Sequence, residues 1–245
     1  MKNRIAIFCR IILVTFMVIS LSACWDIGDL VEENLTIDLK SADKVNVTAA
    51  LYHGDIFISG EKQIPLLISK FSYNLTRWNP EVNYTVDGGE GYLKIVQKKN
   101  TKGLFNPTIN HWFLQFNEDV PLKMDIVMGS GNSQLDLNSV NLIDLKAVIG
   151  TGDTLIDLTG DYQENVNITL VGGIGNTLIN LPADIGIRLM IQGGIYRIRC
   201  DGLNQIGNFY YNSIFNFTER KIFVTLIAGL GMIDVRLVPS ELNEV

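Results

Sequence analysis

Three residues at equivalent positions of an internal repeat could carry acid–base or cation chemistry. Asp136, Asp157 and Asn180 each stand between two apolar residues, so on a β-strand they would face away from the core. If the repeats stack in register, neighbouring side chains of this ladder lie about 5 Å apart. Two carboxylates at that distance could share a proton or bind a cation. Outward positions are ordinarily polar, so a solvated ladder is the favoured interpretation.

A further acidic candidate, Asp153, belongs to a glycine-rich motif. The pattern Gly-x-Gly-Asn/Asp-x-x-Leu/Ile begins at Gly129, Gly150 and Gly173 and is similar to part of the calcium-binding nonapeptide repeat. That repeat holds calcium because successive nine-residue turns stack and share ligands. Here the motifs begin 21 and 23 residues apart. Asx residues that form chain corners are therefore favoured over a metal site, and no cofactor is expected.

Catalytic signatures are missing from the sequence. The two histidines, His53 and His111, belong to no H-E-x-x-H motif, and the chain has no G-x-S-x-G, P-loop or C-x-x-C motif. The sequence therefore predicts a protein that is not an enzyme. Paired acids for glycoside cleavage meet only in the fold, so a polysaccharide-active protein stays open as an alternative.

The N-terminal segment has the features of a secretory signal. Lys2 and Arg4 form a positive region, and Arg10 directly precedes an apolar run over residues 11–21. This run is shorter than the roughly 20 residues that span a bilayer. The run ends in Leu-Ser-Ala followed by Cys24, which is similar to the bacterial lipobox. We therefore predict a lipoprotein signal peptide over residues 1–23, lipidation at Cys24, and a tether over residues 24–34.

Charge and cysteine content narrow the partners and the location. Residues 1–23 contain three bases and no acid, so the remaining chain has 17 bases, 26 acids and a net charge of −9. Such a surface repels nucleic acid, and no nucleic-acid partner is expected. Cys200 is then the one cysteine without a role, which excludes an intramolecular disulfide. The predicted location is extracytoplasmic, on the cell membrane or the outer membrane, through the lipid on Cys24.

The elements that must position these residues are all strands. Apolar residues alternate with polar ones from Leu35 onward, and no segment has a convincing helical period. Short alternating runs separated by Gly- and Asn-rich turns predict an all-β chain. We divide it into an N-terminal β region over residues 35–112, a β-repeat region over residues 113–239 and a tail over residues 240–245.

Each repeat contains two strands of alternating pattern. The second strands begin at Leu145, Val166 and Ile187, 21 residues apart, and weaker echoes of the glycine motif follow at Gly194 and Gly229. One repeat cannot bury its own apolar face, whereas stacked repeats share a continuous core. This predicts a β-solenoid, or flattened β-helix, of two-strand repeats about 21 residues long. The alternative is an antiparallel β-sandwich.

Residues 201–221 lengthen one repeat and are rich in aromatic side chains. A hairpin that caps the end of the stack is the favoured interpretation, because the ends of stacked repeats need a cover. The alternative is an exposed surface for a partner or for sugar rings. The residues of this surface are Phe209, Tyr210, Tyr211, Phe215 and Phe217.

Two stretches resemble the toast-rack family of bacterial envelope proteins: residues 120–132, continuing into Gly150-Thr-Gly-Asp153, and residues 180–187. Similar β-repeats occur in domains named as putative adhesins and in cell-wall-active-antibiotic response proteins. The resemblance spans about residues 30–238 and implies a rack of strands without family-wide catalytic residues. Tyr196 replaces a glycine of the repeat.

Together these features predict a non-catalytic, membrane-anchored envelope lipoprotein. Its rigid β-repeat surface would contact an envelope protein or a cell-wall polymer, as a scaffold, an adhesin-like module or a stress-response accessory. The alternative function is a carbohydrate-binding or polysaccharide-active β-helix protein.

Overall fold

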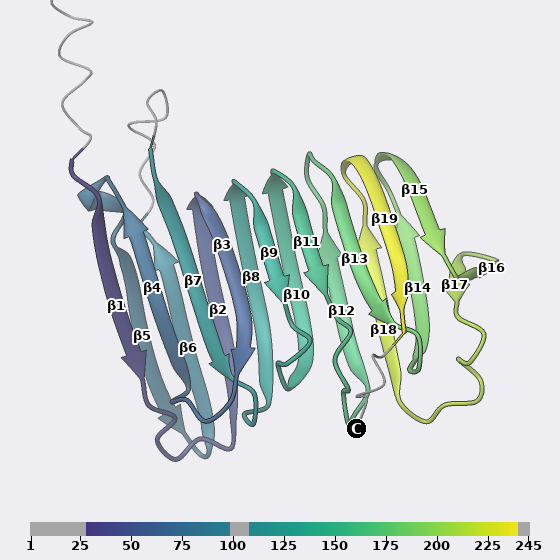
Figure 1. Cartoon of the computed structure of the whole chain (residues 1–245), viewed down its shortest axis with the longest axis horizontal. Helices are drawn as coiled ribbons and strands as arrows, with labels where there is room; N and C mark the ends of the chain where they lie inside the picture. The colour runs from purple at the N-terminus through teal and green to yellow at the C-terminus, as the bar shows by residue number, and fades with distance from the viewer. Residues whose placement is uncertain (1–27, 99–107, 240–245) are drawn as a thin grey trace, which may run out of the picture.

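The computed structural model describes residues 28–98 and 108–239, in which strands are the main secondary structure (Figure 1). A single turn of 3₁₀ helix, η2 (Thr76–Trp78), interrupts them. The all-β prediction is confirmed.

The strands in chain order are β1 (Val31–Ile37), β2 (Lys44–His53), β3 (Asp55–Glu61), β4 (Leu67–Tyr73), β5 (Pro80–Asp87), β6 (Glu90–Gln97), β7 (Asn110–Asn117), β8 (Leu122–Ser130), β9 (Ser133–Asp136), β10 (Leu142–Thr151), β11 (Thr154–Asp157), β12 (Val166–Val171), β13 (Thr177–Pro182), β14 (Gly186–Gln192), β15 (Ile195–Asp201), β16 (Asn204–Ile206), β17 (Phe209–Tyr211), β18 (Lys221–Ile227) and β19 (Leu230–Val238).

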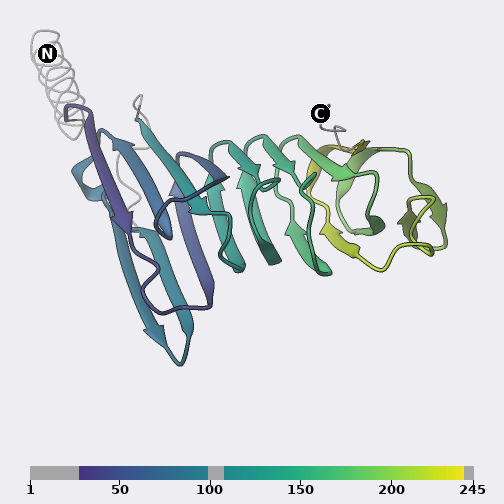
Figure 2. The ribbon, with the colours of Figure 1, turned by 60° about the horizontal axis from the view of Figure 1, so that its bottom comes forward.

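Two sheets face each other across the core. The first sheet has the order β1-β4-β7-β3-β9-β11-β13-β19-β15, and the second has the order β16-β17-β14-β18-β12-β10-β8-β2-β6-β5. A strand of the second sheet and the next strand of the first, such as β8 and β9, form one rung. The rungs follow one another along the long axis of the molecule, as Figures 1 and 2 show.

Neighbouring rungs pair in parallel, and their inward side chains form continuous rows. One such row crosses six strands of the second sheet and is at most 2% exposed. Parallel sheets usually have their faces covered over much of their length. Here each sheet covers the inner face of the other. The row consists of Val47, Met124, Leu145, Ile168, Val224 and Leu189.

Glycines form the corners at which each rung passes from the second sheet to the first. Gly131, Gly152, Gly175 and Gly231 have φ values between 130° and 148°, which side chains rarely adopt. A Cβ atom on any of them would lie 1.9 to 2.0 Å from the carbonyl oxygen of the glycine in the neighbouring rung. The corners therefore stack backbone on backbone, which explains the Gly-x-Gly pattern of the repeat.

The C-terminal rungs do not stack in chain order, and this corrects the predicted sequence of repeats. β12 pairs with β18, and β14 pairs with the other side of β18. The corner explains the order, because a Cβ atom on Gly229 would lie 1.8 Å from the carbonyl oxygen of Gly173. The rung formed by β18 and β19 supplies the glycines that this close approach demands, whereas Tyr196 occupies the second glycine position in β15, opposite Gly231.

The second strands do not pair at the residues where their alternating patterns begin. Leu145 lies opposite Ile168, not opposite Val166, and Val166 lies opposite Ile222. A shift of two residues leaves the same side chains facing the core, so alternation alone does not distinguish the two registers.

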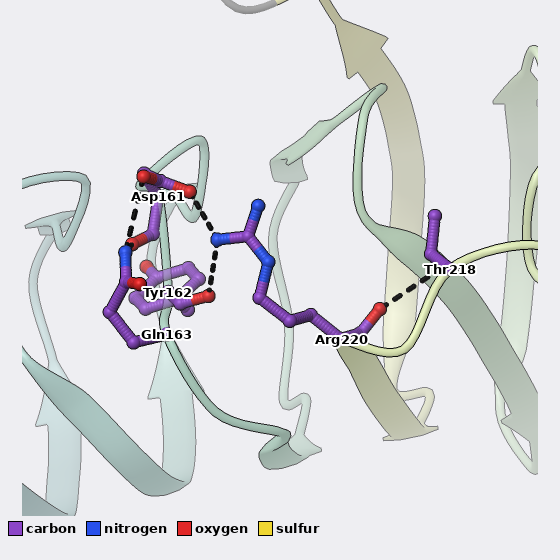
Figure 3. Close-up of polar contacts among 5 residues, drawn as sticks. All are labelled: Asp161, Tyr162, Gln163, Thr218 and Arg220. Carbon is purple, nitrogen blue, oxygen red and sulfur yellow. Dashed lines mark hydrogen bonds and ion pairs between the residues drawn. The ribbon is translucent and has the colours of Figure 1, made fainter.

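Side-chain bonds hold the entry of β18 beside β12. The Arg220 Nη1 atom donates to the carbonyl oxygen of Tyr162 at 2.9 Å and to the carboxylate of Asp161 (Figure 3). The backbone N–H of Lys221 donates to the Oδ1 atom of Asn165 at 2.8 Å. The loop between β11 and β12 is thereby tied to the segment that precedes β18.

Antiparallel strands close both ends of the stack. β1, β4 and β5 pair antiparallel at the N-terminal end, and β16 and β17 do so at the C-terminal end. The molecule thus combines features of both predicted architectures: parallel stacked rungs in the middle, and facing sheets with antiparallel edges.

Two predicted boundaries differ from the elements. β1 begins at Val31 and so occupies the end of the predicted tether, and β7 crosses the predicted boundary after Trp112. The signal peptide, Cys24 and residues 240–245 lie outside the described residues. No helix within residues 28–98 and 108–239 has the length and apolar character to cross a membrane.

Candidate functional site

Aromatic rings gather on the outer face of the second sheet at its C-terminal end. Phe209 and Tyr211 extend from β17, Phe223 extends from β18, and Phe215 lies in the segment between them. The ring centroids of Tyr211 and Phe215 are 4.9 Å apart, and those of Phe215 and Phe223 are 6.4 Å apart. We call these four residues, together with Arg188, the aromatic cluster.

Arg188 lies at the centre of the aromatic cluster. On β14 it stands between Tyr211 of β17 and Phe223 of β18. Its guanidinium carbon is 4.5 Å from the ring centroid of Phe223 and 5.5 Å from that of Phe209. Such cation–π contacts hold the guanidinium against the rings. Arg188 forms no ion pair with any residue in the part of the chain that the structure describes.

A buried asparagine supports the segment that carries these rings. Asn212 is 4% exposed, and its side chain spans two backbone groups at the start of β14. The Nδ2 atom donates to the carbonyl oxygen of Ile185 at 2.7 Å, and the Oδ1 atom accepts from the N–H of Ile187 at 2.9 Å. The aromatic cluster therefore rests on a fixed backbone.

The five residues predicted from sequence do not all lie together. Phe209, Tyr211 and Phe215 belong to the aromatic cluster, whereas Tyr210 points the other way and packs against the core. Phe217 is 86% exposed, outside the ring contacts of the cluster. Sequence reasoning missed Phe223 and Arg188, although the alternation in β18 and β14 marks both as outward positions.

The acidic ladder stacks in register but differs from a solvated row. Asp157 lies opposite Asp136 on one side and Asn180 on the other. Both aspartates are half-buried, and burial, followed by the neighbouring Asp157 charge, raises the pKa of Asp136. The Oδ1 atom of Asp157 accepts from the N–H and the hydroxyl of Thr159, at 3.0 and 2.6 Å.

Asp153 is at the opposite end of β11 from Asp157, so the three acidic candidates do not form one site. Its Oδ1 atom accepts from the N–H of Asn176 at 2.9 Å, and its own N–H donates to the Oδ1 atom of Asn132 at 3.1 Å. The N–H of Asn132 likewise donates to Asp55 Oδ1 at 2.7 Å. Each Asx side chain thus fastens the next rung at the corner, the role that the repeat spacing favoured.

The described residues also contain one serine–histidine contact. His53 Nδ1 lies 2.8 Å from Ser130 Oγ, and the imidazole stacks on Trp78 with ring centroids 6.2 Å apart. Within the described ranges no carboxylate pairs with His53, although such a partner is what orients the base in a nucleophilic triad. Burial raises the pKa of the Cys200 thiol to about 12, which leaves it unreactive near neutral pH.

A family model and one solved structure match most of this chain. The model described as the N-terminal domain of toast_rack, DUF2154, matches residues 26–180. A crystal structure from Clostridium sporogenes, of a protein named "putative cell adhesion protein", is 29% identical with a TM-score of 0.82. The match covers 86% of this chain and 100% of that one.

Other solved structures match at lower sequence identity. A protein from Bacteroides fragilis named "putative adhesin" is 12% identical with a TM-score of 0.30, over 85% of this chain and 97% of that one. None of the curated proteins matches the sequence.

Proposed function

The chain belongs to the toast-rack family, and from this premise we propose that it is a non-catalytic lipoprotein of the bacterial cell envelope. Lipid on Cys24 anchors it, and its two-sheet rack, in effect a short β-solenoid with antiparallel caps, presents a rigid surface to a protein partner. The similarity to a solved protein that is named for cell adhesion supports an interaction role.

The observation that carries this proposal is the aromatic cluster. Its composition is that of interface hot spots, which are enriched in Tyr and Arg and clustered around desolvated centres. Arg188 covers ring faces of Phe209 and Phe223, so these faces are less available to sugar rings. Its unpaired guanidinium suits a carboxylate of a partner, in a bidentate contact. An acidic and apolar protein surface is therefore the expected counterpart.

The position of the aromatic cluster agrees with an anchor at the other end. β1 begins seven residues after Cys24 in sequence and lies at one end of the rack, whereas β17 lies at the opposite end (Figures 1 and 2). Across the intervening strands of the first sheet this separation is about 40 Å. A lipid at the N-terminus would leave the cluster free to meet a partner.

Membrane fractionation in cells tests the anchor. Cys24→Ser is expected to release the protein from the membrane fraction, because the thioether cannot form, while Cys200→Ser stays bound as the matched control. A Cys24→Ser variant that remains with the membrane contradicts the proposed anchor.

Site-specific crosslinking in intact cells tests the surface. A photoreactive amino acid in place of Phe217 is expected to crosslink one envelope protein, and Arg188→Ala is expected to abolish that product. The same group in place of Tyr92, which is 47% exposed at the other end of the rack, serves as the control. Equal crosslinks from both positions, or a product that persists with Arg188→Ala, contradict a partner site at the aromatic cluster.

A further inference from the structure

The outer face of the first sheet carries a groove that lies away from the aromatic cluster. It has a volume of about 460 Å³ and crosses five strands, β3, β9, β11, β13 and β19. Its base is apolar, because Leu155 and Leu178 extend outward in register from adjacent strands. At one end Phe57 lines the groove, and its ring stacks on Phe113 with centroids 4.7 Å apart and planes 7° apart.

One wall of the groove is a regular row of polar groups. Asn132, Asp153 and Asn176 each stand on successive corners, about 4.8 Å apart as rungs are. The Oδ1 atoms of Asn132 and Asp153 each accept a hydrogen bond from a backbone N–H group of the next rung. These bonds fix the orientation of both side chains. Within the described residues, the Nδ2 atoms of Asn132 and Asn176 and the Oδ2 atom of Asp153 have no protein partner. The wall therefore offers oriented donors and acceptors.

A buried carboxylate marks the other end of the groove. Asp234 is 7% exposed, and its Oδ2 atom accepts from the Nε atom of Arg236 at 3.1 Å. Its Oδ1 atom is buried and has no hydrogen-bond partner among the described residues. An acceptor left in this state costs free energy unless a ligand or water satisfies it. Asp234 and Arg236 together line this end of the groove, so their ion pair presents fixed polar groups to a ligand there.

The chemistry of the groove selects among ligand classes. Peptides that add to sheets need a free strand edge, whereas the strands that line this groove are paired on both sides. Arg236 is the one basic residue of the lining, and Asp234 neutralises it. An anionic ligand would therefore be repelled by Asp153 and by Asp55, whose Oδ2 atom is 3.4 Å from His111 Nε2. An apolar base, an aromatic ring and oriented amide and carboxylate groups suit a ligand with C–H faces and many hydroxyls.

We propose that this groove binds an uncharged oligosaccharide chain. One sugar ring lies against Phe57 and its hydroxyls bond to the wall of Asx side chains, while hydroxyls at the far end contact the Asp234–Arg236 ion pair. The regular spacing of the wall suits a polymer whose hydroxyls also repeat. This inference rests on the proposed envelope location, where such chains occur, and it assigns them a surface separate from the aromatic cluster.

Calorimetric titration of the purified full-length protein in detergent micelles tests the groove. The probes are N-acetylglucosamine tetramer, cellotetraose and maltotetraose, which distinguish N-acetylated wall-type chains from plain glucans. Phe57→Ala and Asp234→Asn are each expected to weaken binding of the recognised probe about tenfold or more, and Gln134→Ala less. Tyr92→Ala, an exposed aromatic change outside the groove, is the matched control and should bind as the parent does.

Radical footprinting gives an independent readout that does not depend on variants. Met232 lines the groove and is 44% exposed, so the bound probe should protect it from oxidation while Phe217 stays reactive. Absence of binding by all three probes overturns the groove proposal, as does loss of binding with Phe223→Ala alone. Neither outcome affects the fractionation and crosslinking results. The groove proposal can therefore fail while the proposed function is supported, and the reverse.

Discussion

The middle rungs and the C-terminal end of the rack are built from the same kind of strand but held in different ways. In the middle, β8 to β13 stack in chain order through glycine corners, with Gly150 and Gly173 in backbone contact. At the C-terminal end, β18 and β19 enter between two earlier rungs. Specific side-chain bonds from Asn212 and Arg220 accompany that insertion.

In the middle rungs, the close backbone contacts at the glycine corners determine how the rungs stack. At the C-terminal end, individual side-chain hydrogen bonds contribute as well. A glycine corner has room only for the backbone of the equivalent corner in the next rung. This contact aligns each middle rung with its neighbour. Of the C-terminal rungs, β18–β19 keeps both glycines at Gly229 and Gly231, whereas β14–β15 has Tyr196 in the second position. Buried polar bonds from Asn212 then help to hold β14 in place. Substitutions in the two regions should accordingly differ in size and in kind.

Gly152→Ala is expected to have the largest effect. The new Cβ atom would lie 2.0 Å from the Gly131 carbonyl oxygen at a φ of 142°, so two backbones must separate. We expect a loss of roughly 4 kcal/mol or more in the free energy of unfolding, measured by urea denaturation. Gly88→Ala is the control, with a φ of 57° and nothing within 4 Å of its Cβ atom, and should cost about 1 kcal/mol. Equal losses would contradict the role of the corners.

Asn212→Ala should have the next largest effect, and it tests the C-terminal end. It leaves the carbonyl oxygen of Ile185 and the N–H of Ile187 without partners in a buried place. The expected loss is about 2 to 3 kcal/mol, with hydrogen exchange faster in β14 and β17 than in β10. An exchange increase spread evenly over the middle rungs would show that the two regions are not held separately.

Arg220→Ala should cost about 1 kcal/mol or less, because its contact with Asp161 is exposed. Lys62→Ala removes an ion pair with Glu118 that is 3.5 Å long and whose cation is more exposed than Arg220, so it is the control and should change the unfolding midpoint still less. We expect the difference between the two variants to shrink at high salt. A loss above 3 kcal/mol would mean that Arg220 is essential to the insertion of β18.

Asp136→Asn should give the smallest effect and tests the ladder of the middle rungs. The folded-state pKa of Asp136 is raised, so its charged form destabilises the fold above that pKa, and the variant should be slightly more stable at pH 7. The advantage should shrink as the pH falls through the raised pKa toward 4, because Asp136 then takes up its proton. Thermal unfolding between pH 7 and 4 measures this, with exposed Asp38→Asn as the control. An advantage independent of pH would contradict the assigned cause.

Much of the fold could be read from residue types in order. Alternation after Leu35 predicted strands, because a half-buried strand has a period of two. The Gly-x-Gly motifs predicted corners, and the Asx residues beside them, such as Asn132 and Asp153, were predicted to stand at those corners. These are local properties of short segments, so they require no knowledge of distant neighbours.

The order of the rungs and the grouping of the outward side chains required the three-dimensional arrangement. A strand such as β14 has the same inward pattern as β18, and a two-residue slip keeps every side chain on its face, so alternation cannot tell which strand pairs with β12. Arg188 meets Phe223 only because β18 entered beside β14, and Phe57 and Asp234 share one groove although 177 residues separate them. Such proximity arises from stacking across the whole chain, and no local pattern contains it.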